Sequence, residues 1–225
     1  MMKIDTFDDV DTWVFDLDHT LYPPHMRLFD QIEVRMTAWV MQTLDVDEAE
    51  ADRLRALYWR EHGTTLAGLM REHDMDPEGY LDHVHDIDFS ILSPEPGLAD
   101  AIVALPGRKI IYTNGTRPYA KNVIENRGLS GLFDAIYGIE HADYHPKPDS
   151  AAFDRVFTLD GLSPERAVMF EDDPRNLAVP HALGMGTVHV APEPAPADHI
   201  HHHTSDLRGF LTQLRPDSAP LSSQL

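Results

Sequence analysis

The second half of this chain alternates between strand-like and helix-like segments, and this alternation restricts the possible folds more than any other feature. Short apolar runs that favour strands cover residues 107–115, 133–140, 166–173 and 186–192. Segments with apolar residues at helical spacing follow them, at residues 117–129, 149–159, 174–184 and 204–214. Strands that alternate with helices in this way form a mostly parallel sheet with helices on both faces, so we expect an α/β fold.

The first half of the chain follows a different pattern. A short apolar strand is predicted over residues 12–18, but the segments after it are helical, at residues 27–44, 47–63, 64–73 and 76–87. This helical block interrupts the alternation, so we interpret it as an all-α cap inserted into the α/β core. The expected division is a core of residues 1–22 and 90–215, a cap of residues 23–89 and a flexible tail of residues 216–225.

Composition excludes several classes of function. The 225 residues carry a net charge of −20, which disfavours nucleic acid and anionic membranes as partners because phosphate contacts need clustered Lys and Arg. Cysteine is absent, so disulfides and thiolate metal sites are ruled out. No apolar run approaches the length of a membrane span, and the N-terminal residues lack the pattern of a secretory signal. We therefore expect a soluble, cytoplasmic protein, which could still bind a small phosphate through one local cation.

Two aspartates end the first predicted strand, in the sequence WVFDLDHTLYPP. Asp16 and Asp18 stand two positions apart, so their side chains point the same way if extended geometry continues. Their repulsion falls if a divalent cation lies between them, and Asp172, at the end of another predicted strand, could complete an oxygen-only site. Such a site suits Mg²⁺, which we expect as the cofactor. The alternative is a solvated strand end or a helix N-cap.

Groups that could bind a phosphate follow two other predicted strands. Thr113 offers a hydroxyl, and the turn through Asn114 and Gly115 could direct backbone N–H groups at an anion. Lys147 stands between two prolines in HPKPDS, which stiffen the backbone beneath its charge. Because the carboxyl ends of parallel strands meet at one edge of a sheet, these groups should gather beside the aspartates. The alternatives are an ordinary strand-to-helix turn and a surface lysine.

Two carboxylates, a hard cation, a hydroxyl and a lysine suit phosphoryl transfer. The cation and the lysine would screen the repulsion between an anionic phosphate and an attacking carboxylate. One carboxylate could form an aspartyl-phosphate, while the other could protonate the leaving alcohol and later deprotonate the attacking water. The residues by themselves do not assign these two roles to particular aspartates.

These four motifs resemble those of the haloacid dehalogenase (HAD) superfamily, on its phosphatase side. DLDHT, YTNG, the lysine of HPKPD and FEDDPRN look like its four motifs in order, from about residue 12 to residue 190. The resemblance implies a Rossmann-like, three-layer core with a helical cap of the C1 type inserted after the first motif. The fourth motif departs from the pattern, because Glu171 and Asn176 stand where many relatives have Gly and Asp.

The resemblance also implies a role for each matching residue. Asp16 would be the nucleophile and a Mg²⁺ ligand, and Asp18 would be the general acid and base and would bind Mg²⁺ through its backbone carbonyl. The remaining roles are phosphate binding by Thr113 and the Asn114 amide, charge stabilisation by Lys147 and Mg²⁺ ligation by Asp172. The dehalogenases of the superfamily lack an acid at the position of Asp18, which implies a phosphatase here.

The segments DLDHTLYPP and GTTLAGL look similar to the pyrimidine 5′-nucleotidase branch, whose members release phosphate from nucleoside monophosphates. We therefore expect a phosphorylated metabolite of that kind, with four cap residues facing its base or ribose: Arg60, His62, Thr64 and Thr65. The aromatic residues at helical positions of the cap are expected in its core: Trp39, Tyr58 and Trp59. Alternatives are a phosphoglycolate or phosphosugar phosphatase, a phosphomutase, and a non-catalytic phosphate-binding regulator. The histidines of residues 199–203 are interpreted as having incidental metal affinity.

Overall fold

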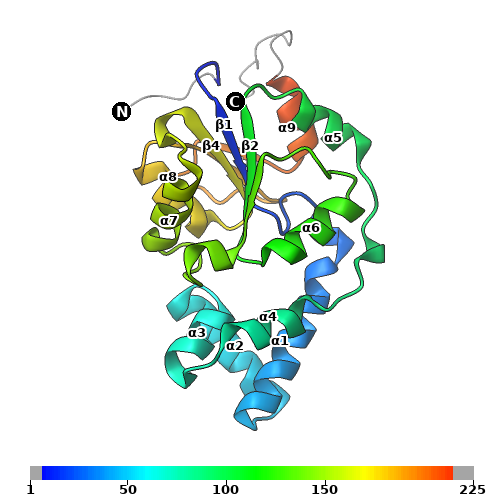
Figure 1. The fold of residues 1–225 in the computed structure, drawn as a ribbon, viewed down its shortest axis with the longest axis vertical. Coiled ribbons are helices and arrows are strands. Elements are labelled where there is room, and N and C mark those ends of the chain that lie inside the picture. The colour runs from blue at the N-terminus through cyan, green and yellow to red at the C-terminus, as the bar shows by residue number, and fades with distance from the viewer. Residues whose placement is uncertain (1–6, 215–225) are drawn as a thin grey trace.

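The computed structural model describes residues 7–214, which contain a six-stranded sheet (Figure 1). The strands lie in the order β3-β2-β1-β4-β5-β6, and each adjacent pair is parallel. Their bounds are Thr12–Phe15 (β1), Arg108–Tyr112 (β2), Ala135–Tyr137 (β3), Ala167–Glu171 (β4), Gly186–Val190 (β5) and His202–Thr204 (β6). The prediction of a mostly parallel sheet is confirmed.

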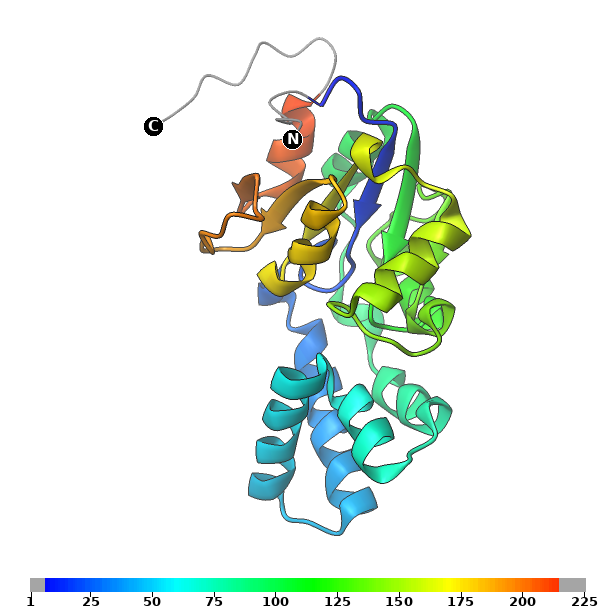
Figure 2. The same cartoon turned by 90° about the vertical axis from the view of Figure 1, so that its left-hand side faces the viewer.

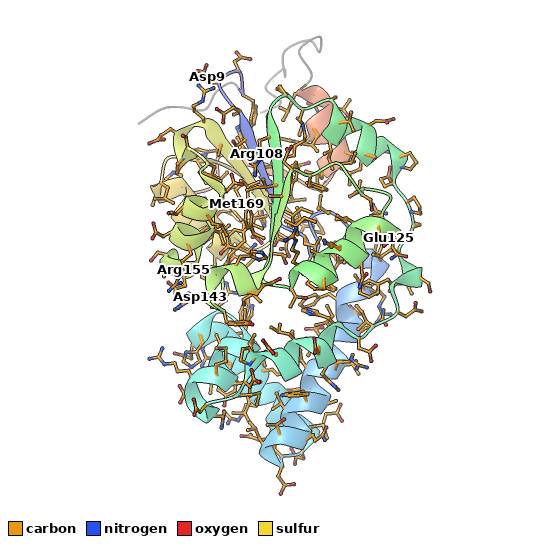
Figure 3. The ribbon with its side chains drawn as sticks, viewed as in Figure 1. Asp9, Arg108, Glu125, Asp143, Arg155 and Met169 are labelled. Carbon is orange, nitrogen blue, oxygen red and sulfur yellow. The ribbon has the colours of Figure 1, made fainter. Side chains whose placement is uncertain are left out.

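Helices cover both faces of the sheet. Side chains alternate along β1, so Trp13 and Phe15 face a layer formed by α5, α6 and α9, whereas Val14 faces α7 and α8 on the other side (Figure 1). Because β1 is buried on both faces, its sequence is apolar at successive positions. These helices span Pro96–Val103 (α5), Arg117–Asn126 (α6), Ser150–Asp160 (α7), Ala178–Ala182 (α8) and Leu207–Gln213 (α9). The result is the Rossmann-like, three-layer core that the family resemblance implied, with side chains such as Met169 filling the space between the sheet and its helices (Figure 3).

Four further helices form a bundle beyond the carboxyl ends of the strands, and we call this bundle the cap (Figures 1 and 2). Side-chain N-caps at Asp47, Thr64 and Asp76 begin three of them, because each accepts a hydrogen bond from an otherwise unpaired backbone N–H. Two of the helices pack very closely, since a Cβ on Gly68 would lie 2.2 Å from Cγ of Tyr58. The cap helices span Leu28–Leu44 (α1), Glu48–His62 (α2), Thr65–His73 (α3) and Pro77–His85 (α4).

Short 3₁₀ helices connect these elements, at Pro24–Met26, Phe89–Ile91, Ile139–Ala142, Pro164–Arg166 and Pro174–Leu177. Helix α5 and strand β6 were not predicted, and β6 lies within the histidine-rich segment, where it pairs with β5 at the sheet edge. Within residues 7–214 no helix has the length and apolar character needed to cross a membrane. The predicted tail, residues 216–225, lies outside the described residues, as do residues 1–6 of the predicted core.

Candidate active site

The carboxyl ends of β1, β2 and β4 bring the predicted motifs together. Phe15 pairs with Ile111 in β2 and with Phe170 in β4, and the Asp16 N–H donates to the Phe170 carbonyl over 2.9 Å. A cavity of about 830 Å³ lies between this edge of the sheet and the cap. It is lined by all the core residues predicted for the site, namely Asp16, Asp18, Thr113, Asn114, Gly115, Lys147 and Asp172.

Lys147 lies buried between two carboxylates. Its Nζ is 2.6 Å from Asp16 Oδ1 and 2.6 Å from Glu171 Oε2, and it also donates to the Tyr112 carbonyl over 3.1 Å. Burial would lower the pKa of Lys147, but the two carboxylates outweigh burial and raise it, so the ammonium stays charged. Burial and the charge of Glu171 raise the pKa of Asp16 to about 7, against the effect of the lysine. A fixed cation thus holds Asp16 in place.

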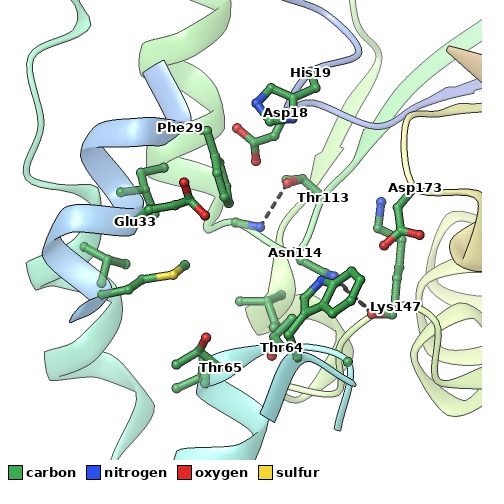
Figure 4. Close-up of a pocket in the computed structure, with 18 of the residues that line it drawn as sticks. Asp18, His19, Phe29, Glu33, Thr64, Thr65, Thr113, Asn114, Lys147 and Asp173 are labelled. Carbon is green, nitrogen blue, oxygen red and sulfur yellow. Dashed lines mark hydrogen bonds between the residues drawn. The ribbon is translucent and has the colours of Figure 1, made fainter. Parts of the chain in front are cut away.

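Asn114 positions the lysine by binding both sides of its backbone (Figure 4). The Lys147 N–H donates to Asn114 Oδ1 over 2.8 Å, and Asn114 Nδ2 donates to the Lys147 carbonyl over 3.1 Å. The Gly115 N–H donates to the Thr113 hydroxyl oxygen over 2.9 Å, so this N–H is directed at the threonine. The turn after β2 therefore orders both the lysine and the Thr113 hydroxyl.

Three carboxylates among the described residues could hold a metal ion. Asp16, Glu171 and Asp172 each offer an oxygen, and these oxygens lie within 4.8 Å of one another. With Asp18, four carboxyl groups lie at this edge of the cavity, and the buried ammonium of Lys147 binds two of them, Asp16 and Glu171. This excess of negative charge fits a hard divalent cation bound by oxygen. Burial raises the pKa of Asp172, and His19 Nδ1, which is 3.4 Å from Asp172 Oδ2, partly offsets that shift. Both oxygens of Glu171 accept hydrogen bonds, Oε2 from the lysine and Oε1 from the Asp173 N–H over 3.1 Å, whereas the lysine binds Asp16 only at Oδ1. Asp16 and Asp172 are therefore the less encumbered ligands.

Asp18 has surroundings that differ from those of Asp16. The hydroxyls of Tyr22 and Tyr119 both donate to its Oδ1, each over 2.5 Å. Burial raises the pKa of Asp18, and these two hydrogen bonds oppose the shift. The side chain is still partly exposed, and Figure 4 shows its carboxyl group directed into the cavity. At this strand end, Asp16 is therefore bound by a lysine and Asp18 by two tyrosine hydroxyls.

Trp59, near the end of α2, joins the cap to the core. The guanidinium carbon of Arg175 lies 3.5 Å from the centre of its ring, and the same guanidinium binds Asp173 over 2.6 Å. The expectation that Trp59 belongs to the cap core is wrong, because its side chain is 51% exposed, whereas Tyr58 beside it is buried. The two residues of the fourth motif that depart from the family pattern both line the cavity. Glu171 binds the lysine, and Asn176 is buried in the cavity wall.

The structure brings two of the four predicted cap residues to the cavity, Thr64 and Thr65 (Figure 4). Arg60 and His62 line a separate cavity instead, where Arg60 binds Glu61 and His62 Nε2 lies 3.3 Å from a carboxylate of α3. Sequence reasoning missed several other cap residues that line the main cavity, among them Phe29, Glu33, Met36, Arg55 and Tyr80.

A signal for two of these missed residues was present in the sequence. Glu33 stands four positions after Phe29, and Arg55 stands between Ala51 and Tyr58 at helical spacing. Each is therefore a charged residue on a face that is otherwise packed. Figure 4 shows the Glu33 carboxylate directed into the cavity.

Comparisons with known proteins agree with this geometry. The family model of haloacid dehalogenase-like hydrolases matches residues 13–190. Among curated proteins, Phosphate metabolism protein 8 of Saccharomyces cerevisiae is 27% identical over 193 residues, which cover 78% of this chain. The chain spans 59% of the length of that relative.

Solved structures share the fold. The magnesium-bound HAD-hydrolase YfnB of Bacillus subtilis is 17% identical, with a TM-score of 0.59 over 91% of this chain and 98% of that one. The L-2-haloacid dehalogenase of Xanthobacter autotrophicus, with chloropropionic acid covalently bound, is also 17% identical, with a TM-score of 0.56 over 93% and 100%. At such identities the likeness concerns the fold alone. Because the family match at residues 13–190 includes the cap and every motif gathered at the cavity, this chain belongs to the haloacid dehalogenase-like hydrolases.

Proposed function

We propose that this hydrolase is a Mg²⁺-dependent phosphomonoesterase that acts through an aspartyl-phosphate on Asp16. The different surroundings of Asp16 and Asp18 carry the proposal. A carboxylate beside a buried ammonium suits nucleophilic attack, whereas a carboxyl group held by two hydroxyls suits proton transfer. Neighbouring carboxylates that are kept in different environments commonly divide the chemistry in this way.

The reaction has two steps. In the first, an Asp16 oxygen attacks phosphorus, the bond between phosphorus and the ester oxygen breaks, and Asp18 gives its proton to the leaving alcohol. In the second, water attacks the aspartyl-phosphate while Asp18 takes a proton from it, which releases inorganic phosphate and restores Asp16. Lys147 stays an ammonium in both steps and stabilises the negative charge that develops beside Asp16.

The residues at the site fit a magnesium ion. Asp16, Asp172 and the backbone carbonyl of Asp18 would hold it, and the charge excess of the buried carboxylates supports this choice. When bound, Mg²⁺ screens the repulsion between the phosphate and these carboxylates. The Asp172→Ala variant should need more Mg²⁺ for half-maximal activity, and an unchanged Mg²⁺ titration would remove Asp172 from the metal site.

The proposed substrates are nucleoside 5′-monophosphates, with pyrimidines preferred. The volume of the cavity, about 830 Å³, is large for a two-carbon leaving group such as glycolate. Its cap side offers the apolar surfaces of Phe29, Ile32 and Met36 beside the charged groups of Glu33 and Arg55. Apolar walls with a few polar groups suit a nucleobase, which has apolar faces and a polar edge.

A panel of phosphate esters tests the substrate proposal. UMP and CMP should be hydrolysed with higher kcat/KM than glucose 6-phosphate, ribose 5-phosphate or phosphoglycolate. Equal rates across the panel would favour a general phosphosugar or phosphoglycolate phosphatase, and transfer of phosphate to a sugar acceptor would favour a phosphomutase. Including 2-chloropropionate tests dehalogenation, which the acid at Asp18 disfavours.

The Asp16→Asn variant tests catalysis itself. It keeps the shape of the side chain but cannot form an aspartyl-phosphate, so turnover should vanish while the circular dichroism spectrum and Tm remain close to those of the unaltered chain. Retained Mg²⁺-dependent turnover would remove Asp16 as the nucleophile. An unaltered chain that binds phosphate but hydrolyses no ester would support the alternative of a non-catalytic regulator.

A further inference from the structure

Two buried tyrosines hold one oxygen of Asp18. Tyr22 follows β1 on the way to the cap, and Tyr119 lies in the first turns of α6, so the two rings come from segments far apart in the chain. Both side chains are almost fully buried, at 0% and 1% exposure. Each hydroxyl oxygen lies 2.5 Å from Asp18 Oδ1, and the two lie 3.4 Å from each other.

This arrangement leaves the two oxygens of Asp18 unequal. A carboxylate oxygen that accepts two hydrogen bonds has used both of its lone pairs, so a proton on Asp18 belongs on Oδ2. Within residues 7–214 no group donates a hydrogen bond to Oδ2. Asp18 lines the cavity with its carboxyl group directed inward, which leaves Oδ2 for the substrate (Figure 4).

The cap covers one of the two tyrosines. The His85 ring of α4 stacks on Tyr119, with 4.4 Å between centroids and 12° between planes. The Thr116 hydroxyl, which accepts from the Tyr119 N–H over 3.3 Å, also lies 3.3 Å from His85 Nδ1. Phe89 packs beside the same ring at 5.9 Å. The position of Tyr119, and hence of Asp18, therefore depends on contacts from both the core and the cap.

We infer that Tyr22 and Tyr119 are positioning residues that hold Asp18 so that Oδ2 carries the proton to the leaving oxygen. The inference rests on the proposed phosphatase function and extends it. In the first step the Oδ2 proton passes to the leaving oxygen as its bond to phosphorus breaks, and the two hydroxyls stabilise the carboxylate that remains. In the second step Oδ2 takes the proton from water. Both tyrosines keep their own protons throughout, because a phenol, with an ordinary pKa near 10, is a far weaker acid than a carboxyl group.

Esters with different leaving groups test this role. An alkyl phosphate such as UMP needs a proton on its leaving oxygen, whereas 4-nitrophenolate leaves readily without one. Because kcat/KM covers the steps up to the aspartyl-phosphate, it reports on this proton transfer. In Tyr22→Phe and Tyr119→Phe, kcat/KM should fall about 10- to 100-fold for UMP, or for the best alkyl ester of the panel, since each loses a hydrogen bond to a charged group. For 4-nitrophenyl phosphate, kcat/KM of both variants should stay within about threefold of the value for the unaltered chain.

A matched control and a second comparison make the test specific. Tyr137 also donates a hydrogen bond to a carboxylate, Asp160 Oδ2 over 2.9 Å, but it does not line the cavity. Tyr137→Phe should therefore leave kcat/KM unchanged for both the alkyl ester and 4-nitrophenyl phosphate. In Asp18→Asn, kcat/KM should also fall more for the alkyl ester than for 4-nitrophenyl phosphate, and this difference should be larger than in the tyrosine variants. Equal losses on both esters, or no loss on either, in variants with an unchanged Tm would overturn the positioning role while leaving the phosphatase function in place. An unaltered chain that hydrolyses neither ester would overturn the phosphatase function and, with it, this inference.

Discussion

Acid should destabilise this protein through His85, the last residue of α4. Its ring is packed against Tyr119 of the core, and burial lowers the pKa of His85 from 6.5 to about 4. The folded chain therefore takes up this proton less readily than the unfolded chain does. It follows that the contribution of His85 to the free energy of unfolding is fully present above pH 6.5 and declines as the pH falls toward 4.

The size of the effect follows from the two pKa values. Between about pH 7.5 and about pH 5, one group with a pKa of 6.5 in the unfolded chain and about 4 in the folded chain lowers the free energy of unfolding by about 2 kcal/mol. The ring is only half-buried on the cavity side, so about 2 kcal/mol is an upper value.

Urea unfolding at both pH values measures this loss in the unaltered chain and in His85→Phe. A phenyl ring can keep the stacking on Tyr119 but cannot take up a proton. His25→Asn, at an exposed histidine near the start of the cap, controls for the removal of a histidine as such. The loss of stability at low pH should be smaller in His85→Phe than in the other two chains. Equal losses in all three would refute the reasoning, because the contact between cap and core would then tolerate a charged ring.

Three further substitutions test the packing around the site by urea unfolding. Lys147→Met should cost about 3–5 kcal/mol, because two buried carboxylates lose their cation, and an unchanged stability would contradict the buried ion pairs. Gly68→Ala should cost about 1–3 kcal/mol, because the new Cβ would lie 2.2 Å from Cγ of Tyr58 in α2. Gly79→Ala is its control: the new Cβ would lie 3.4 Å from the nearest atom, so this substitution should not destabilise α4. Trp59→Leu should cost only about 0.5–1 kcal/mol, since its contact with Arg175 is solvent-exposed; a larger loss would mean that the contact holds the cap in place.

The parallel sheet and the predicted core site were accessible from the sequence because both depend on local patterns. Alternating strand and helix segments determine the sheet, and the ends of parallel strands meet at one edge whatever their order in it. Asp16, Thr113 and Asp172 each follow a strand directly, so their convergence needed no knowledge of side-chain packing. Lys147 lies in a loop beyond β3, and both its order after that predicted strand and the family motif indicated its place beside Asp16.

The elements that escaped prediction depend on contacts between distant residues. Strand β6 has no apolar alternation, because its histidines lie at the sheet edge, and it exists through its pairing with β5. Arg60 and His62 were expected at the cavity because they adjoin the GTTLAGL segment of the nucleotidase resemblance, but the rotation of α2 about its axis directs them to a separate cavity. Tyr22 lies four positions from Asp18, but the bond from Tyr119 to Asp18 joins residues 101 positions apart, and no local pattern reveals such a contact.

The cap occupies a single connection, between β1 and α5, and no strand of the sheet depends on it for pairing. One continuous stretch of coding sequence could therefore be exchanged for another helical bundle while the buried lysine and its carboxylates keep their places. A replacement would need to reproduce a ring against Tyr119 and a partner for Arg175. Recombination of this insert would thus change the wall of the cavity that the cap provides and leave the wall that the core provides unchanged.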